Sequence, residues 1–175
     1  EIFMNLSQSF LAALRHGLTT DGAPFIVMDL MHGSLTDVLA REGTLPWADA
    51  VAIGADIAGA VQAAHDEGIL HRDIKPDNIL VSRYGHAQLA DFGISSIFDT
   101  AVGARDVVTA RIAHAAPEVL EGRRASPASD VYSLASTMVA MIRGRAPFSQ
   151  APDERVAVVI CRVRRDAPPR LAGFG

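Results

Sequence analysis

Several residue types and patterns are scarce or missing in this chain of 175 residues. A single cysteine, Cys161, excludes a disulfide within the chain, suits a reducing compartment such as the cytoplasm, and is expected to be buried or half-buried. The longest apolar stretch, 50–64, is interrupted by Asp56 and Gln62 and is shorter than the roughly 20 residues of a membrane span. Residues 1–14 lack a basic start before their apolar stretch, so no signal peptide is expected.

Lysine is almost absent: Lys75 stands alone against fifteen arginines, an imbalance that we attribute to a GC-rich coding bias. The net charge of −4 and the isoelectric point near 5.8 give no broad basic surface, so nucleic acid is not an expected partner. Hydrophobic residues make up 49% and charged residues 21%, which is typical of a globular chain. The length allows one domain with a proper core.

Apolar residues recur at helical spacing in several segments. A helix capped by Ser34 is expected to run to about Gly43, and a longer one from Pro46 to Gly68. Further helices are expected over 128–142 and 153–165. The apolar positions that we assign to the second helix are Val51, Ala55, Ala58, Val61 and Ala64, and those of the third are Val131, Leu134, Ala135, Met138 and Ile142.

Short apolar runs bounded by turn residues predict a few strands. Residues 25–28 follow the turn signal 20–24 and are expected to form a buried strand. Two runs, 79–81 and 87–89, are separated by a turn and predict a small hairpin. Residues 94–115 show no clean period and are expected to form a loop. The fold class is therefore α+β and mostly helical.

Chemistry-bearing residues are concentrated between His71 and Asp91. Pro76 prevents a regular helix across Asp73 and Asn78, so a loop can aim both side chains at one point. Asp73 could orient an attacking hydroxyl and accept its proton, while Lys75 could offset charge on a transferring phosphate. Asn78 and Asp91 supply hard oxygen ligands suited to Mg²⁺. This set is what phosphoryl transfer requires.

The motifs His71-Arg-Asp-Ile-Lys-Pro-Asp-Asn78, Asp91-Phe-Gly93 and Ala116-Pro-Glu118, in that order, resemble those of the eukaryotic-type protein kinases. They correspond to the catalytic loop, the magnesium loop and the end of the activation segment. The resemblance implies a kinase-like fold, ATP and Mg²⁺ as cofactors, and a protein substrate with Ser or Thr. Lys75 resembles the serine/threonine class, and the Ala- and Arg-rich composition suggests a bacterial member.

The same resemblance assigns roles to residues outside the motifs. Residues 27–30 resemble the hinge between the lobes, with Met28 as gatekeeper. Adenine would lie against Leu80 and the hinge residues Asp29 to Met31. Asp130 would steady the backbone of the catalytic loop, and Gly93 after Phe92 would let the magnesium-bearing turn reorient. His71 is expected to be structural, and the other histidines are expected to be surface or packing residues: His16, His32, His65, His86 and His114.

The chain departs from the kinase pattern at both ends. It contains no G-x-G-x-x-G and its only lysine lies in the catalytic loop, so it supplies no phosphate-anchoring strand lysine, and Glu1 is too close to the next strand to replace the helix glutamate. The arginine that pairs with Glu118 in the family is also missing. We therefore expect a truncated kinase domain, with residues 1–31 as a remnant of the small lobe and hinge and residues 32–175 as a partial large lobe. As such a fragment it is expected to bind ATP weakly and to be inactive alone.

The activation segment departs as well. The family has Gly-Thr where this chain has Ala110-Arg111, which affects substrate positioning; Arg111 could pair with an acidic partner. Arg72 beside Asp73 favours control by phosphorylation, because the cation needs a counter-charge to order the loop. Candidate acceptors of the phosphoryl group are Thr109, Thr100, Ser95 and Ser96. The equally weighted alternative is that they are ordinary solvated loop residues.

Two other functions fit parts of the sequence. A non-catalytic kinase-like scaffold or nucleotide sensor agrees with the missing small-lobe elements, although Asp73, Asn78 and Asp91 are all present. A small-molecule kinase of the aminoglycoside or choline type shares the fold and a related site, but Lys75 and the 116–118 motif speak against it. Phosphorylation of a basic protein rather than an aminoglycoside would distinguish a protein kinase from such a small-molecule kinase.

Overall fold

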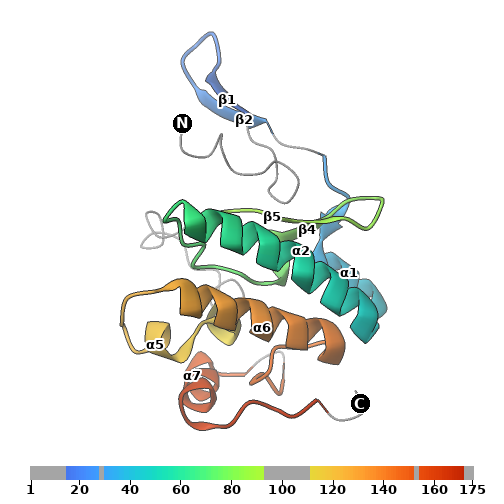
Figure 1. Ribbon diagram of the computed structural model, residues 1–175, viewed down its shortest axis with the longest axis vertical. Helices are drawn as coiled ribbons and strands as arrows, with labels where there is room; N and C mark the ends of the chain where they lie inside the picture. The colour runs from blue at the N-terminus through green and yellow to red at the C-terminus, as the bar shows by residue number, and fades with distance from the viewer. Residues whose placement is uncertain (1–14, 28–29, 93–110, 152–153, 172–175) are drawn as a thin grey trace.

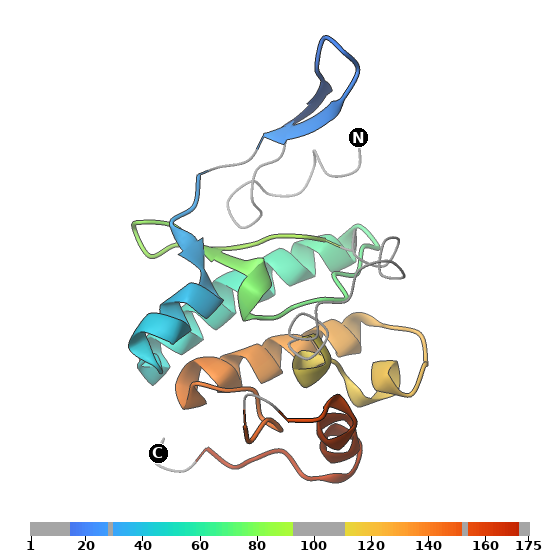
Figure 2. The same ribbon diagram turned by 180° about the vertical axis from the view of Figure 1, so that it is seen from behind.

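The structure is a computed structural model that describes residues 15–27, 30–92, 111–151 and 154–171. Two long helices, α2 (Trp47–Asp66) and α6 (Pro127–Arg143), lie side by side at its centre (Figures 1 and 2). The hairpin of β4 (Ile79–Val81) and β5 (Ala87–Leu89) covers one side of α2, and α5 (Pro117–Leu120) and α7 (Val156–Arg165) lie beyond α6. This arrangement confirms the mostly helical α+β fold.

The helix expected from Ser34 to Gly43 is present as α1 (Leu35–Glu42). It begins with a capping box, in which the Ser34 hydroxyl accepts the N–H of Asp37 at 3.2 Å and the Asp37 carboxylate accepts the N–H of Ser34 at 2.7 Å. It ends at Gly43, whose φ of 78° is available to glycine at low cost. The local sequence alone therefore determines both ends of this helix.

Helix α2 has the expected extent, but our assignment of its buried face is only partly right: Val61 and Ala64 are buried as expected, and the other three positions are not. Val51, Ala55 and Ala58 are exposed, and the buried residues are Ala50, Gly54, Ile57, Ala60, Val61 and Ala64. Alanine and glycine are spread around the whole helix, so apolar spacing fits more than one face. No helix among the described residues combines the length and hydropathy that crossing a bilayer requires.

Helix α6 also differs from expectation in the face that it buries. Val131 is 59% exposed and Ala135 is exposed, whereas Ser129, Ser133, Ser136 and Thr137 are buried. The Ser133 and Thr137 hydroxyls donate to the carbonyl oxygens four residues earlier, at 3.0 and 2.9 Å. These bonds satisfy the hydroxyls inside the helix, which lets a polar face be buried.

The strands form two antiparallel sheets. The predicted hairpin is present as β4 and β5, with Ile79 opposite Leu89, and β3 (Gly33–Ser34) adds a third strand beside β4. Strand β2 (Pro24–Val27) pairs with β1 (Arg15–Leu18) in a separate hairpin. Our expectation that residues 25–28 are buried is wrong for the described part, because Phe25 and Val27 are 42% and 51% exposed.

Three smaller expectations also need correction. Helix α7 begins at Val156 and not at Asp153, which lies outside the described residues. Residues 111–114, expected to be loop, are helical. Cys161 is exposed on α7 because the buried face of this helix is formed by Val159 and Val163.

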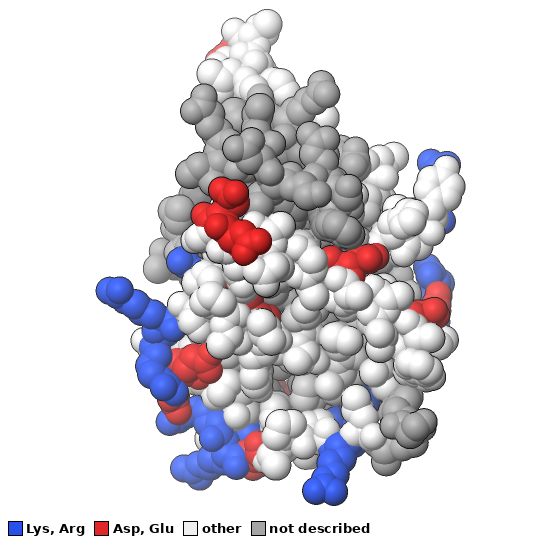
Figure 3. All heavy atoms as spheres, in the orientation of Figure 1, with Lys and Arg blue, Asp and Glu red and all other residues white. Residues whose placement is uncertain are grey.

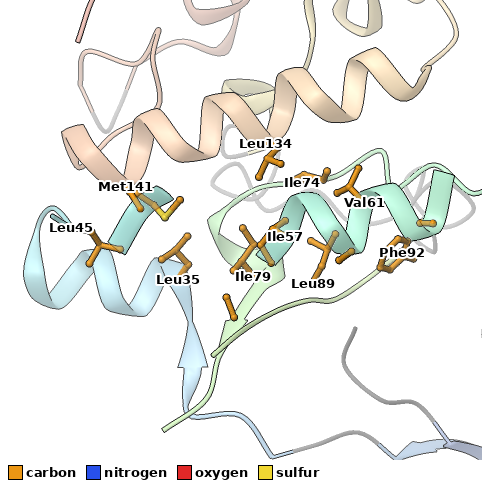
Figure 4. Close-up of a cluster of buried hydrophobic side chains, with 14 residues drawn as sticks. Leu35, Leu45, Ile57, Val61, Ile74, Ile79, Leu89, Phe92, Leu134 and Met141 are labelled. Carbon is orange, nitrogen blue, oxygen red and sulfur yellow. The ribbon is translucent and has the colours of Figure 1, made fainter. Parts of the chain in front are cut away.

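The main core lies between α1, α2, α6 and the hairpin of β4 and β5 (Figure 4). Leu35, Ile57 and Ile79 are fully buried and point toward one another, and Leu89 of β5 completes this group. Ile74, from the segment that connects α2 to β4, is 1% exposed and lies between Val61 and Leu134. The core therefore fixes the position of the segment that carries the candidate site.

Gly144, which ends α6, provides a stability test. It has a φ of 72°, and a Cβ there would lie 2.6 Å from the carbonyl oxygen of Gly43. Gly122 has a similar φ of 78° but no atom within 4 Å of the same position. Both alanine variants incur the left-handed penalty of about 1 kcal/mol, but only Gly144→Ala must also shift backbone.

We expect Gly144→Ala to lower the free energy of unfolding by about 2 kcal/mol or more, and Gly122→Ala by about 1 kcal/mol. Urea denaturation of the two variants beside the parent chain measures the difference. Equal losses would show that the junction of α1 and α6 relaxes without cost.

Candidate active site

The catalytic-loop motif lies between α2 and β4, where the chain has little regular structure. Residues 71–75 are extended or irregular, and η2 (Pro76–Asn78) is a single 3₁₀ turn. His71, Ile74 and Lys75 are buried, whereas Arg72 is exposed and Asp73 is partly exposed. Ile74 anchors the segment in the core (Figure 4), and this fixes the positions of the polar residues on either side of it.

Asp130, in the first turn of α6, holds this loop by its backbone. One carboxylate oxygen accepts the N–H of His71 at 2.9 Å, and the other accepts the N–H of Arg72 at 2.8 Å. The ring of His65, at the end of α2, contributes a third contact at 2.8 Å. Asp130 is 1% exposed, so these donors and the N-terminus of α6 replace the water that its charge has lost.

His71 is held as a neutral ring. Its Nε2 donates to the carbonyl oxygen of Ala90 at 2.9 Å, while its Nδ1 accepts the N–H of Asp73 at 3.2 Å. Burial lowers the pKa of His71, in agreement with a ring that both donates and accepts. The ring also lies 4.5 Å from that of Phe92, at an interplanar angle of 57°. His71 therefore connects the catalytic loop to the segment that follows β5.

The Asp73 carboxylate is the point on which the other polar groups converge. Lys75 Nζ lies 3.3 Å from its Oδ2, and Asn78 Nδ2 donates to the same oxygen at 3.1 Å and to the Asp73 carbonyl at 2.7 Å. Arg111 Nε lies 3.6 Å from Oδ1. The acidic partner anticipated for Arg111 is thus Asp73 itself. Cations and donors therefore flank both carboxylate oxygens.

Asn78 and Asp91 lie at the same end of the hairpin of β4 and β5. Ile79 is opposite Leu89, and the N–H of Ala90 donates to the Asn78 carbonyl at 2.9 Å, so the pairing continues one step past the strands. The Asn78 amide group is committed to Asp73, which leaves its carbonyl oxygen for a cation. The Asp91 side chain is exposed, whereas Phe92 beside it is buried.

This donor set fits Mg²⁺. One amide oxygen and one carboxylate are hard ligands, and Mg²⁺ normally completes its shell with phosphate and water oxygens. Among the described residues no group of three or more His, Cys, Asp or Glu could hold a metal ion. A cation at this end of the hairpin would therefore depend on Asn78, Asp91 and a bound phosphate.

Two site residues hold backbone angles that side chains other than glycine rarely adopt. Arg72 has a φ of 69° and Asp91 a φ of 62°, and they are the non-glycine residues with positive φ in the described chain. Each costs on the order of 1 kcal/mol, and such angles persist where the surroundings enforce them. Asp130 accepts the N–H of Arg72, and Phe92, the residue after Asp91, is buried.

The residues assigned to the adenine side are only partly described. Met28 and Asp29 lie outside the described residues. Met31, two residues before β3, and Leu80, on β4 opposite Ser34, are both partly exposed. Gly93 and the candidate phosphorylation sites Thr109, Thr100, Ser95 and Ser96 also lie outside the described residues.

Glu118 has a partner other than the arginine that the resemblance implied. The Ser129 hydroxyl donates to its carboxylate at 2.7 Å, which ties α5 to the first turn of α6. Burial, and then the charge of Glu118, raise the pKa of Tyr132 on the same helix. Glu118 therefore lies at a junction of helices and not beside Asp73.

His65 and His114 were expected to be surface or packing residues, and the sequence did not predict their side-chain partners. His114 is 7% exposed and its Nδ1 is 2.9 Å from the hydroxyl of Ser136 on α6. Burial, and then the charge of Lys75, lower its pKa to about 4. Neither residue has a spacing signal, because each finds its partner on a helix distant in sequence.

Buried His114 and His71 predict how the stability of the fold depends on pH. In the unfolded chain each is protonated below about pH 6.5, whereas folded His114 stays neutral down to about pH 4. The unfolded state therefore binds more protons in this interval, and stability falls as the pH drops from about 6.5 to 4. The loss for His114 is on the order of 3 kcal/mol, and the lowered pKa of His71 acts in the same direction.

Denaturant unfolding at several pH values measures this slope. In His114→Gln the slope between about pH 6.5 and 4 should become smaller. In His86→Gln, at an exposed position, it should not change. An unaltered slope in His114→Gln would assign the acid sensitivity to other groups.

Comparison with known sequences agrees with this geometry. The sequence-family model of the protein kinase domain matches residues 1–167. The chain is similar to serine/threonine-protein kinase PknK of Mycobacterium bovis, with 43% identity over 169 residues that cover 94% of this chain and 15% of PknK. It is also similar to serine/threonine-protein kinase PknL of Mycobacterium tuberculosis, with 34% identity over 147 residues that cover 83% of this chain and 36% of PknL.

A third relative is the probable serine/threonine-protein kinase CPE1738 of Clostridium perfringens, with 35% identity over 153 residues, 86% of this chain and 22% of that protein. The chain thus spans between 15% and 36% of the length of these bacterial relatives. The expected resemblance is confirmed, and the scaffold and small-molecule kinase alternatives are not favoured. On both sequence and fold, this chain belongs to the protein kinase domain family.

Proposed function

We propose that this chain provides the large-lobe part of a serine/threonine protein kinase site, which transfers the γ-phosphoryl group of ATP to a protein hydroxyl. The observation that carries the proposal is the convergence of Lys75, Asn78 and Arg111 on Asp73, beside a hairpin end that presents Asn78 and Asp91. The bacterial relatives named as serine/threonine kinases support the same class of acceptor.

Each residue then has a defined task. Asp73 orients the acceptor hydroxyl and accepts its proton as the oxygen attacks phosphorus. Lys75, 3.3 Å from Asp73, offsets negative charge on the transferring group. Asn78 and Asp91 would hold Mg²⁺, which when bound neutralises the phosphate oxygens. His71, Phe92 and Asp130 position these groups without touching the substrate.

The lobe boundary forms part of the proposal. We assign residues 1–31 to the small lobe and hinge, with Met28, Asp29, Met31 and Leu80 against the adenine, and residues 32–175 to the large lobe. In support, β1 and β2 stand apart from the helical body in Figure 1. The chain contains no Gly-rich phosphate loop and no second lysine, so efficient ATP binding requires a small lobe supplied with it.

The test is transfer of label from γ-labelled ATP by the protein encoded in the full reading frame. We expect label on serine or threonine of a basic protein, dependence on Mg²⁺, and no label on an aminoglycoside. Label on the aminoglycoside, or none on any acceptor with the metal present, would contradict the proposal. The 175-residue chain assayed alone should show little or no transfer.

Arg111 is expected to restrain the reaction. Its Nε lies 3.6 Å from Asp73 Oδ1, the oxygen that neither Lys75 nor Asn78 contacts and that an acceptor hydroxyl would approach. We therefore expect Arg111→Ala to raise the transfer rate severalfold, because the hydroxyl no longer competes with a guanidinium. Steady-state rates beside Arg83→Ala, at an exposed turn, measure the effect; a lower rate would show that Arg111 positions Asp73.

A further inference from the structure

A cavity of about 490 Å³ lies between the end of α6 and the end of α7. Its walls come from the connection after α6 and from the residues that follow α7. Three arginines line it, Arg143, Arg145 and Arg162, together with Phe148 and Asp166. The volume is in the range of about 300–1,000 Å³ typical of ligand sites.

The surrounding segment is strongly basic in an acidic protein. Residues 143–170 contain seven arginines and three acidic residues, a net charge of +4, whereas the whole chain has −4. In Figure 3 blue atoms gather over the lower part of the molecule, around α5 and α7. The field at this end therefore attracts anions, although the protein as a whole repels them.

The arginines of the cavity are not equally engaged. Arg162 is bound by Glu154, whose pKa it lowers to about 2, and it also donates to the Phe148 carbonyl at 2.9 Å. Among the described residues, Arg143 and Arg145 each donate one hydrogen bond, to the carbonyls of Pro147 and Gln150, at 3.3 Å. Within the described chain neither of the two forms an ion pair. Most of their donors therefore remain for a ligand.

We propose that this cavity binds a phosphorylated serine or threonine side chain of a protein, held by Arg143 and Arg145. Two planar guanidinium groups in one cavity match a dianionic phosphoryl group, whose oxygens accept paired hydrogen bonds. This identification of the ligand rests on the proposed function, because a serine/threonine kinase generates phosphoserine and phosphothreonine on its substrates.

The site is distinct from the reaction centre. Its residues come from the ends of α6 and α7, whereas Asp73 and Asn78 lie between α2 and β4. A phosphorylated segment held there would keep a substrate that already carries one phosphate bound to the kinase. Arg143 lies in the last turn of α6, where its positive charge interacts favourably with the helix dipole. Arg145 lies beyond the end of the helix, so the dipole does not account for its presence.

The test is equilibrium binding of short Gly- and Ala-rich peptides to the 175-residue chain without ATP, followed by fluorescence anisotropy. The peptides carry phosphoserine, serine or glutamate at the same position, and inorganic phosphate serves as competitor. We expect the phosphoserine peptide to bind at least about tenfold more tightly than the other two. Binding should weaken with added salt.

Four variants sharpen the result. Arg143→Gln and Arg145→Gln should each weaken the phosphopeptide about tenfold or more, while Arg83→Gln, with the same change of charge on the turn after β4, should not. Asp166→Asn removes the acidic group that lines the cavity and should tighten binding. Circular dichroism of each variant shows whether it is folded.

Equal binding of the phosphoserine and serine peptides, or unchanged affinity in Arg143→Gln and Arg145→Gln, would overturn the proposal. Inorganic phosphate that binds as tightly as the phosphopeptide would overturn it as well, in favour of a free-anion site. The proposed kinase activity is judged separately. If the protein of the full reading frame binds the phosphopeptide but transfers no phosphate, the kinase activity is refuted and this site remains in place.

Discussion

Asp73→Asn should lower the rate of phosphoryl transfer by about 10²- to 10⁴-fold, the range for loss of a general base. The asparagine can still occupy the space between Lys75 and Asn78, so the fold and the binding of nucleotide should persist. It cannot accept the hydroxyl proton, and its amide group adds a donor where Lys75, Asn78 and Arg111 already donate.

Asp77→Asn is the matched control for this variant. Asp77 lies in the same loop, on η2, and is exposed. The same chemical change there should leave the rate within about twofold of the parent, since surface substitutions have small effects. Rates for both variants, measured with the protein of the full reading frame, decide the matter. Equal rates for Asp73→Asn and the parent would remove Asp73 from catalysis.

Asp130→Asn should have the largest effect on stability. Three donors aim at the carboxylate, from His71, Arg72 and His65, at 2.8–2.9 Å. An amide offers only one oxygen, so one N–H of the loop would face the NH₂ group and lose its acceptor in a buried site. We expect the free energy of unfolding to fall by about 3 kcal/mol or more, in keeping with broken buried polar networks.

Asp49→Asn provides the comparison for Asp130→Asn. Asp49 also lies in the first turn of a helix, α2, but it is exposed. Its loss removes only a favourable interaction with the helix dipole, about 0.3–1 kcal/mol. Chemical denaturation of both variants separates the buried network from the dipole. Similar losses would mean that water replaces the contacts of Asp130.

Sequence reasoning was most accurate where short-range chemistry decides the outcome. The cap at Ser34, the end of α1 at Gly43 and the turn between β4 and β5 depend on neighbouring residues. The offsets within residues 71–78 likewise indicated that several polar side chains could converge, because the loop is short and Pro76 excludes a helix.

What the sequence could not provide was tertiary placement. Helices α2 and α6 carry small residues on every side, so their spacing did not reveal which face is buried. The contacts of His65 with Asp130 and of Arg111 with Asp73 join residues separated by 65 and 38 positions. No local pattern encodes such pairs; they follow from tertiary structure, such as the packing of α2 against α6.

The position of Lys75 has a consequence for the chemical reactivity of this protein. It is the only lysine, and it is 6% exposed beside Asp73. The folded surface of the described chain therefore offers acylating reagents no side-chain amine in open contact with water. Modification of Lys75 must await an opening of the catalytic loop, so its acylation rate would report how often that loop opens.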